Sequence, residues 1–185
     1  MTDDAYALRL ARPDDVETLE MLIDDSVRGL GEAYYTPAEI DAGLRHVFGV
    51  DTQLVDDGTY FVIEHRAVAV ACGGWSGRRT LFGGDQHKSE PDTRLDPRTD
   101  AARIRAFFVH PAHARRGLGR RLYEACANAA RAEGFSSFEL MATLPGVPLY
   151  VALGFEPLEP VAVPTPVGVP LPCVRMRRAI DVIPS

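Results

Sequence analysis

The order of apolar and polar residues predicts a strand, a turn and a helix in the middle of the chain. Between positions 102 and 109 apolar side chains occur on both faces, as in a strand that is covered on both sides. Pro111 has no N–H group for a sheet and therefore ends the strand. From Leu118 onward, apolar residues recur at helical spacing until Gly134. We therefore predict a central strand–turn–helix unit over residues 102–133.

The rest of the chain continues this alternation of strands and helices. A capping box at Thr36–Glu39 with a proline at the first helical position marks the start of one helix. Strands are predicted at 5–11, 59–64, 67–75, 137–143, 155–163 and 171–180, and further helices at 14–29 and 145–153. The sequence predicts an α+β fold with a mixed, mostly antiparallel sheet of six to seven strands, flanked by about four helices, in a single domain over 1–185.

Two segments of the pattern need a specific explanation. Residues 76–101 form a long polar connection rich in Gly, Arg, Asp, Thr and Pro, and we expect a partly ordered lid. Without an apolar period, this lid should be mobile in the free protein, with fast hydrogen exchange over 86–99. Gly73 and Gly74 stand inside a predicted strand, where either a bulge or a wall against a ligand would explain them.

Composition narrows the possible partners. The net charge of −6 and the isoelectric point near 5.3 argue against general nucleic-acid binding. Cys72, Cys126 and Cys173 are an odd number at wide spacing, which favours free thiols in a reducing compartment. No 18 apolar residues run together and the first residues contain no apolar signal region, so we expect a cytoplasmic protein without a membrane partner.

The turn before the central helix has the chemistry of an anion site. The N–H groups at a helix start lack helical partners, and Gly117 and Gly119 have no Cβ atoms to keep a phosphate away. Four arginines surround the turn: Arg115, Arg116, Arg120 and Arg121. The spacing matches neither the P-loop nor the dinucleotide fingerprint. The H-x-x-H pair in the same turn has no further ligands, so we expect no metal.

The stretch VHPAHARRGLGRRLYEAC resembles the acyl-CoA-binding motif of the GNAT superfamily of N-acetyltransferases, with Ala114 in place of the usual leading Gln or Arg. YVALGF, which begins at Tyr150, resembles that family's Y-x-x-x-G-F element, although Thr143 stands where the family often has Asn. The resemblance implies acetyl-CoA as co-substrate and no metal. It places CoA on Phe107, Phe108, Val109, Arg115, Arg116, Gly117, Leu118, Gly119 and Arg120.

The resemblance also implies roles in catalysis. Tyr150 would be the acid that protonates the departing thiolate of CoA, and the alternative is that its ring only packs against the cofactor. A general base is left open among Glu139, Glu64, His110 and a chain of water molecules. By strand alternation, Arg103 and Arg105 should share a face with Phe107 and form a positive patch beside the acyl group.

The acceptor is expected to be the amine of a small molecule. Tyr34 and Tyr35, between the first two helices, and Trp75, after the paired glycines, are candidate acceptor contacts, with packing as the alternative. The sequence leaves open a non-catalytic acyl-CoA sensor and a protein acetyltransferase acting on a lysine or an N-terminus. A homodimer is left open as the assembly.

Overall fold

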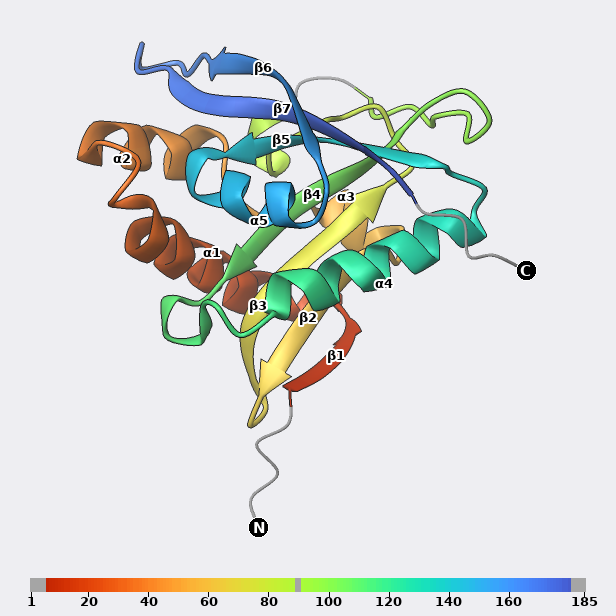
Figure 1. Cartoon of the computed structure of the whole chain (residues 1–185). Coiled ribbons are helices and arrows are strands. Elements are labelled where there is room, and N and C mark those ends of the chain that lie inside the picture. The colour runs from red at the N-terminus through yellow and green to blue at the C-terminus, as the bar shows by residue number, and fades with distance from the viewer. Residues whose placement is uncertain (1–5, 89–90, 181–185) are drawn as a thin grey trace.

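The computed structural model describes residues 6–88 and 91–180, and the seven strands found there form one sheet in the order β1-β2-β3-β4-β5-β7-β6 (Figure 1). The strands are β1 (Tyr6–Leu10), β2 (Tyr60–His65), β3 (Val68–Ser76), β4 (Ala102–Val109), β5 (Ser137–Thr143), β6 (Glu156–Val163) and β7 (Leu171–Ala179). Only β4 and β5 pair in parallel. The expected mixed, mostly antiparallel sheet is confirmed.

The described residues contain five α-helices, one more than expected. They are α1 (Val16–Gly31), α2 (Pro37–His46), α3 (Thr52–Asp56), α4 (Leu118–Ala132) and α5 (Val147–Ala152). Thr36 caps α2 in the predicted capping box, accepting from the N–H of Glu39 at 3.2 Å. The additional helix, α3, is too short to show a helical period, and its start is fixed by the Asp51 side chain, which accepts from the N–H of Gln53.

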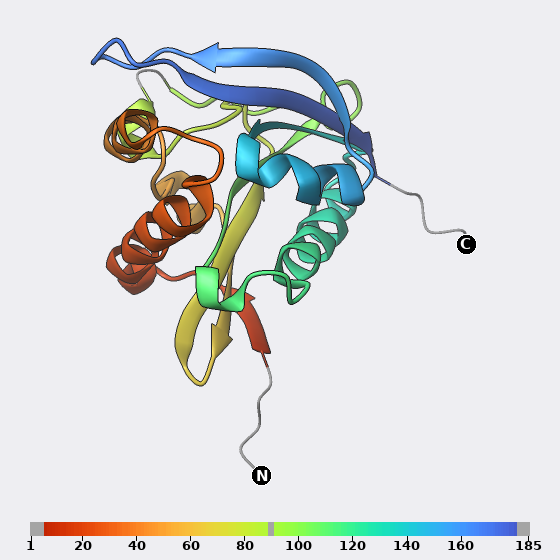
Figure 2. The same ribbon diagram turned by 60° about the vertical axis from the view of Figure 1, so that its left-hand side comes forward.

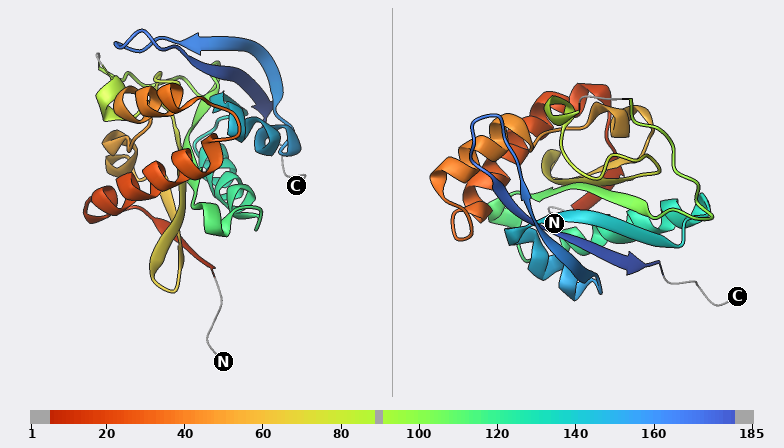
Figure 3. Two further views of the ribbon diagram at one scale, coloured as in Figure 1. Left: turned by 90° about the vertical axis from the view of Figure 1, so that its left-hand side faces the viewer. Right: turned by 90° about the horizontal axis from the view of Figure 1, so that it is seen from above.

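The helices cover the two faces of the sheet (Figure 2). Helices α1 and α2 lie on one face, and α4 and α5 lie on the other. The view from above in Figure 3 shows β6 and β7 crossing over the end of the sheet beside α5. One cluster of buried apolar residues, which includes Leu19, Tyr60 and Cys72, fills the α1–α2 side. A second, with Trp75, Cys126 and Phe138, fills the α4–α5 side.

Local signals explain most element boundaries. The predicted hairpin between β2 and β3 turns at Arg66 and Ala67, whose φ angles of 52° and 63° give the left-handed pair of a two-residue turn. The helix expected from Asp14 begins instead with a 3-10 turn at Pro13–Asp15 before α1.

All three cysteines are buried and free, as the sequence predicted. Within the described part of the chain, no helix has the length and apolar character needed to cross a membrane.

Candidate active site

Strands β4 and β5 separate soon after they meet. Their parallel pairing is confined to Ala102 opposite Phe138 and Arg103 opposite Glu139. Beyond these pairs the strands diverge, and a cavity of about 90 Å³ opens next to residues 104–108 of β4. The sheet thus has an opening in its middle, beside the predicted strand–turn–helix unit.

A bulge in β4 shapes one wall of this cavity. Ala106 has a φ of 52°, and the pairing register of β3 with β4 shifts between Cys72 and Gly74. The Tyr60 hydroxyl, from β2, donates a hydrogen bond of 3.0 Å to the Ala106 carbonyl and so supports this unusual backbone of β4. The bulge interrupts the alternation of side chains along the strand.

The interrupted alternation corrects the expected positive patch. The Phe107 ring packs with the α4–α5 cluster, whereas Arg105 points to the other side, where its guanidinium donates to the Thr80 carbonyl at 3.1 Å. Arg105 and Phe107 therefore do not share a face. Strand alternation gave the wrong face for Phe107 because the bulge inserts one extra residue. After that residue, each side chain points to the face opposite to the one that simple alternation predicts.

The paired glycines of β3 lie opposite this bulge. A Cβ atom on Gly73 would lie 2.3 Å from the Phe107 ring, and one on Gly74 would lie 2.5 Å from the Thr59 carbonyl oxygen. Both glycines are needed because other parts of the protein approach the backbone closely. Of the two explanations that the sequence left open, the bulge accounts for Gly73, while the approach of the Thr59 carbonyl accounts for Gly74.

The turn between β4 and α4 has the predicted exposed helix start. Arg115 and Gly117 are left-handed, with φ angles of 63° and 78°, and Gly117 is the N-cap residue of α4. The N–H of Arg121 donates to the Gly117 carbonyl at 3.1 Å, in the pattern of an α-helix. The N–H groups of the helical residues before Arg121 therefore have no acceptor within the helix. Arg116 and Arg120 are exposed beside them. This arrangement favours an anion.

The two glycines of the turn have different surroundings. A Cβ atom on Gly117 would meet nothing within 4 Å, so the space outside this residue is open. A Cβ atom on Gly119 would lie 2.6 Å from the Leu149 side chain. Gly117 therefore leaves room for a ligand, while Gly119 allows α4 to pack against α5.

Tyr150 lines the cavity from α5. Its ring centroid lies 6.1 Å from that of Phe107 and 5.6 Å from that of Phe155. Burial raises the pKa of Tyr150 above its ordinary value of 10.0, so the phenol is protonated at neutral pH. A protonated hydroxyl at this place can donate a proton to a group bound in the cavity.

The cavity connects the two faces of the sheet. Phe107, Leu149 and Tyr150 belong to the apolar cluster on the α4–α5 side or pack against it. Phe48 and Phe82 belong to the cluster on the α1–α2 side or pack against it. A group bound from the α4–α5 side and a second group bound from the α1–α2 side could therefore meet between β4 and β5.

The three predicted acceptor contacts lie outside the residues that line the cavity. Tyr34 is exposed. Tyr35 is buried, and its hydroxyl donates to the Pro172 carbonyl at 2.7 Å and accepts from the N–H of Leu144 at 2.9 Å. Trp75 is buried in the core against Phe135. The geometry favours the packing alternative for Tyr35 and Trp75.

The three candidate bases also lie outside that lining. The Glu139 carboxylate accepts from Arg175 at 2.8 Å and from Arg103 at 3.3 Å, at the closed end of the β4–β5 opening. Glu64 pairs with Arg9 at 2.6 Å on the outer strands. His110 accepts from the N–H of Ala112 in the turn before α4. None of the three is in place to take a proton from an amine in the cavity.

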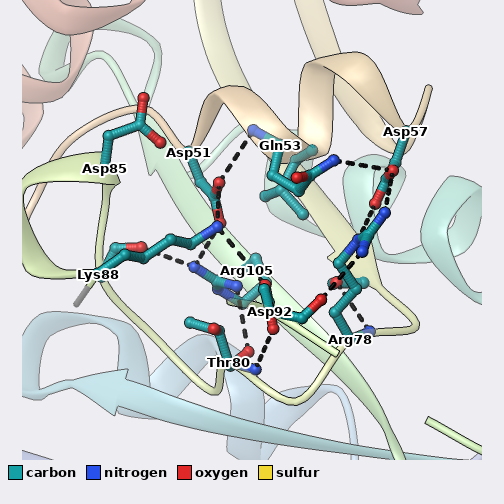
Figure 4. Close-up of polar contacts among 12 residues, drawn as sticks. Asp51, Gln53, Asp57, Arg78, Thr80, Asp85, Lys88, Asp92 and Arg105 are labelled. Carbon is teal, nitrogen blue, oxygen red and sulfur yellow. Dashed lines mark hydrogen bonds and ion pairs between the residues drawn. The ribbon is translucent and has the colours of Figure 1, made fainter. Parts of the chain in front are cut away.

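Another wall of the cavity is formed by Leu81, Phe82, Gly83 and Gly84 of the insert. The insert is held by a network of ion pairs and hydrogen bonds, shown in Figure 4. The Asp51 carboxylate contacts Arg105 at 2.9 Å and Lys88 at 2.6 Å. Arg105 also donates to the carbonyl of Gly83 at 2.6 Å. Arg78 pairs with Asp57 at 2.6 Å in the loop after α3. Ion pairs thus attach the insert to both ends of α3, and the hydrogen bonds of Arg105 attach it to β4.

This network changes the expectation for the insert. Its described residues are ordered by buried ion pairs and backbone hydrogen bonds, such as those from Arg79 to Thr93 and from Leu95 to Gly77, so we no longer expect a mobile lid. Polar composition suggested mobility because the ion partners, Asp51 and Asp57, lie far away in sequence. We expect the amides of Arg79 and Leu95 to exchange slowly in the free protein. Exchange of these amides as fast as in an unfolded peptide would contradict this structure of the insert.

Asp51 should contribute strongly to stability. Asp51→Asn keeps the shape and the cap of α3 but leaves the buried guanidinium of Arg105 without its anion. We expect a loss of about 3 kcal/mol in the free energy of unfolding, measured by urea denaturation. Asp96→Asn is the control, since Asp96 pairs at the surface with the exposed Arg98, and we expect a much smaller loss there. Equal losses in the two variants would contradict the importance of the buried pair.

Sequence reasoning missed much of the cavity. Lining residues that were not predicted include Phe48, at the end of α2, Phe82, in the insert, and Met141, in β5. Their side chains are ordinary apolar ones, and nothing in the local pattern separates them from core residues. Only the meeting of distant segments makes them part of one site.

Comparison with solved structures supports the fold. A GCN5-related N-acetyltransferase from Rhodopseudomonas palustris is 18% identical, with a TM-score of 0.69 over 97% of this chain and 98% of that one. The PaiA N-acetyltransferase of Thermoplasma acidophilum, in complex with coenzyme A, is 11% identical, with a TM-score of 0.63 over 95% and 99% of the two chains. YncA of Salmonella typhimurium, with its cofactor acetyl-CoA, is 18% identical, with a TM-score of 0.62 over 98% and 97%.

Comparison at the level of sequence gives the family. No curated protein matches the chain. The family model described as the acetyltransferase (GNAT) family matches residues 17–155, which run from α1 through the cavity and the Tyr150 element. This match covers most of the chain and includes both motifs on which the sequence resemblance rests. The protein therefore belongs to the GNAT family of acetyltransferases and is an acyltransferase.

Proposed function

We propose that the protein transfers the acetyl group of acetyl-CoA to the amine of a small molecule by direct attack. The observation that carries this proposal is the cavity between β4 and β5, which is lined by residues from both faces of the sheet. The two substrates would meet in this opening, with Tyr150 in its lining.

The start of α4 would hold the pyrophosphate of CoA. Gly117 leaves open space outside its backbone, and the exposed Arg115, Arg116 and Arg120 add positive charge. The residues in this turn thus fit a doubly charged phosphate group. The pantetheine arm would follow the β4 backbone at Phe107–Val109 toward the cavity, where β5 no longer pairs with β4.

The reaction then needs few groups from the protein. A neutral amine attacks the thioester carbonyl carbon, the C–S bond breaks, and the Tyr150 hydroxyl protonates the sulfur as it leaves. Backbone N–H groups at the β4 bulge are our candidates for the donors that stabilise the developing oxyanion. Tyr150 lies in the lining of the cavity, which its role as the acid requires.

Two observations favour a small-molecule transferase over the alternatives. Leu81, Phe82 and Gly83 of the ordered insert form a wall of the cavity, which opposes a wide groove for a protein substrate. Tyr150 lies in the lining, where a catalytic acid would be needed, which favours a catalytic protein over a non-catalytic acyl-CoA sensor.

Acetyl-CoA binding and turnover test this proposal. Calorimetry should show one acetyl-CoA bound per chain, and a screen of small amines should show release of free CoA thiol that depends on the amine. The three cysteines are buried, so a thiol reagent reads mainly the released CoA. Absence of acetyl-CoA binding would contradict the proposed function.

A further inference from the structure

The part of the cavity on the α1–α2 side is mainly aromatic. Phe48, Phe82 and Phe108 form its walls with Met141, and the rings of Phe48 and Phe108 lie edge to face with centroids 6.1 Å apart. Among the described residues that line the cavity, none is Asp, Glu, Lys or His. His87 stacks on Phe82 at 4.8 Å between ring centroids but does not line the cavity.

The polar side chains of the lining are either uncharged or have their charge balanced by a neighbouring residue. Arg105 is the charged residue of the described lining, yet it is 2% exposed. Its guanidinium contacts the Asp51 carboxylate at 2.9 Å and donates to the carbonyls of Thr80 and Gly83. Burial raises the pKa of the Cys173 thiol to about 11, so this thiol is uncharged at neutral pH. The cavity offers an amine neither a carboxylate partner nor a base.

This lining discriminates against strongly basic amines. An alkylamine with the pKa of a lysine side chain, about 10.4, is neutral in only about one molecule in 2,500 at pH 7. The protonated form would have to enter an apolar site without a counter-ion, which is unfavourable. An aromatic amine is already neutral at this pH, and its ring can pack edge to face against phenylalanine.

We propose that the acceptor is a small, weakly basic aromatic amine, and not an alkylammonium compound or a polyamine. This inference rests on the proposed function, because it concerns the second substrate of the same site. The small size of the cavity, about 90 Å³, agrees with a small acceptor and not with a long polyamine.

The transfer is balanced without a base from the protein. The amine nitrogen forms a bond to the carbonyl carbon, the C–S bond breaks, and Tyr150 gives its proton to the sulfur. The nitrogen loses one proton, and solvent carries that proton back to the Tyr150 oxygen. The products are an N-aryl acetamide and free CoA.

A matched pair of amines tests the inference. Aniline and cyclohexylamine have similar size and shape but differ in basicity and in the flat ring. With acetyl-CoA at pH 7 we expect thiol release with aniline, and a kcat/KM for cyclohexylamine that is lower by about tenfold or more. The kcat/KM for cyclohexylamine should rise with pH as more of it becomes neutral, while that for aniline should stay flat from pH 6 to 9. Spermidine should not be acetylated.

A charge placed in the wall should weaken the preference for the aromatic amine. Met141→Glu adds a carboxylate to the lining, and Met141→Gln adds a polar group of the same length without charge. We expect Met141→Glu to lower the ratio of aniline to cyclohexylamine turnover by about tenfold relative to Met141→Gln, since the carboxylate can pair with an ammonium group. Circular dichroism and acetyl-CoA affinity show whether each variant is folded.

The outcomes separate this inference from the function on which it rests. Loss of acetyl-CoA binding in the unaltered protein would overturn both. If acetyl-CoA binds but cyclohexylamine or spermidine is preferred, or no aromatic amine is acetylated, the acceptor class is wrong while the proposed cofactor site stands. An equal ratio in the two Met141 variants would also overturn the argument from charge.

Discussion

Tyr150→Phe is expected to lower kcat about 10²-fold while leaving the affinity for acetyl-CoA nearly unchanged. The substitution removes the proton that the phenol would give to the leaving sulfur but keeps the ring between Phe107 and Phe155. Because burial raises the pKa of Tyr150 above 10.0, its acid form should persist through the neutral range, and kcat should not fall between pH 7 and about 9 through loss of this proton.

The matched control is Tyr123→Phe. Tyr123 is buried on the same side of the sheet, and its ring packs on Phe155 at 5.8 Å, but it does not line the cavity. Removing its hydroxyl should change kcat less than about twofold. Full activity in Tyr150→Phe would exclude Tyr150 as the acid and leave solvent as the proton source. A similar fall in both variants would indicate a structural effect of losing a buried hydroxyl.

Gly117→Val is expected to abolish binding of acetyl-CoA in calorimetry without unfolding the protein. The N-cap glycine of α4 has a φ of 78°, a conformation that a β-branched residue rarely adopts. A Cβ atom there would meet no protein atom within 4 Å, so the valine would project into the open space where we place the pyrophosphate. Strain in the turn and loss of that space both weaken binding.

A second glycine separates these two effects. Gly168, in the connection from β6 to β7, has a φ of 74° and also has nothing within 4 Å of a Cβ atom. Gly168→Val should therefore cause similar strain, measured as a similar drop in melting temperature, with acetyl-CoA affinity unchanged. Unaltered affinity in Gly117→Val would refute the placement of the pyrophosphate at this turn.

Much of the fold could be predicted from the sequence because many helix and strand signals depend only on residues that are close together in the chain. The α4 turn could be predicted because a helix start exposes N–H groups wherever it occurs, and because Gly117 tolerates the left-handed backbone that the turn requires. The capping box at Thr36 likewise needs only residues within one helical turn. Strands were recognisable from runs of apolar residues, so the sheet and most boundaries followed.

Predictions failed where a side chain depends on partners far along the chain. The bulge at Ala106 has no local signal, because Tyr60 and Gly73 of other strands accommodate it, and it reverses the face of Phe107 relative to Arg105. The insert was expected to be mobile because its composition is polar, and composition does not show with which distant residues its charged side chains pair. Asp51, 54 positions before Arg105, supplies the partner that buries this arginine.

The sequence by itself therefore determined the family, the class of fold and the place for an anion, since each rests on neighbouring residues whose backbone chemistry is the same in any context. The character of the acceptor cavity was decided only by the tertiary structure. Its walls come from the end of α2, the insert, β4, β5 and β7, and each segment alone looks like core or loop. Whether such a cavity is charged depends on which acidic and basic side chains pair in the folded chain. That pairing depends on distances between residues that are far apart in sequence, and the sequence does not give those distances directly.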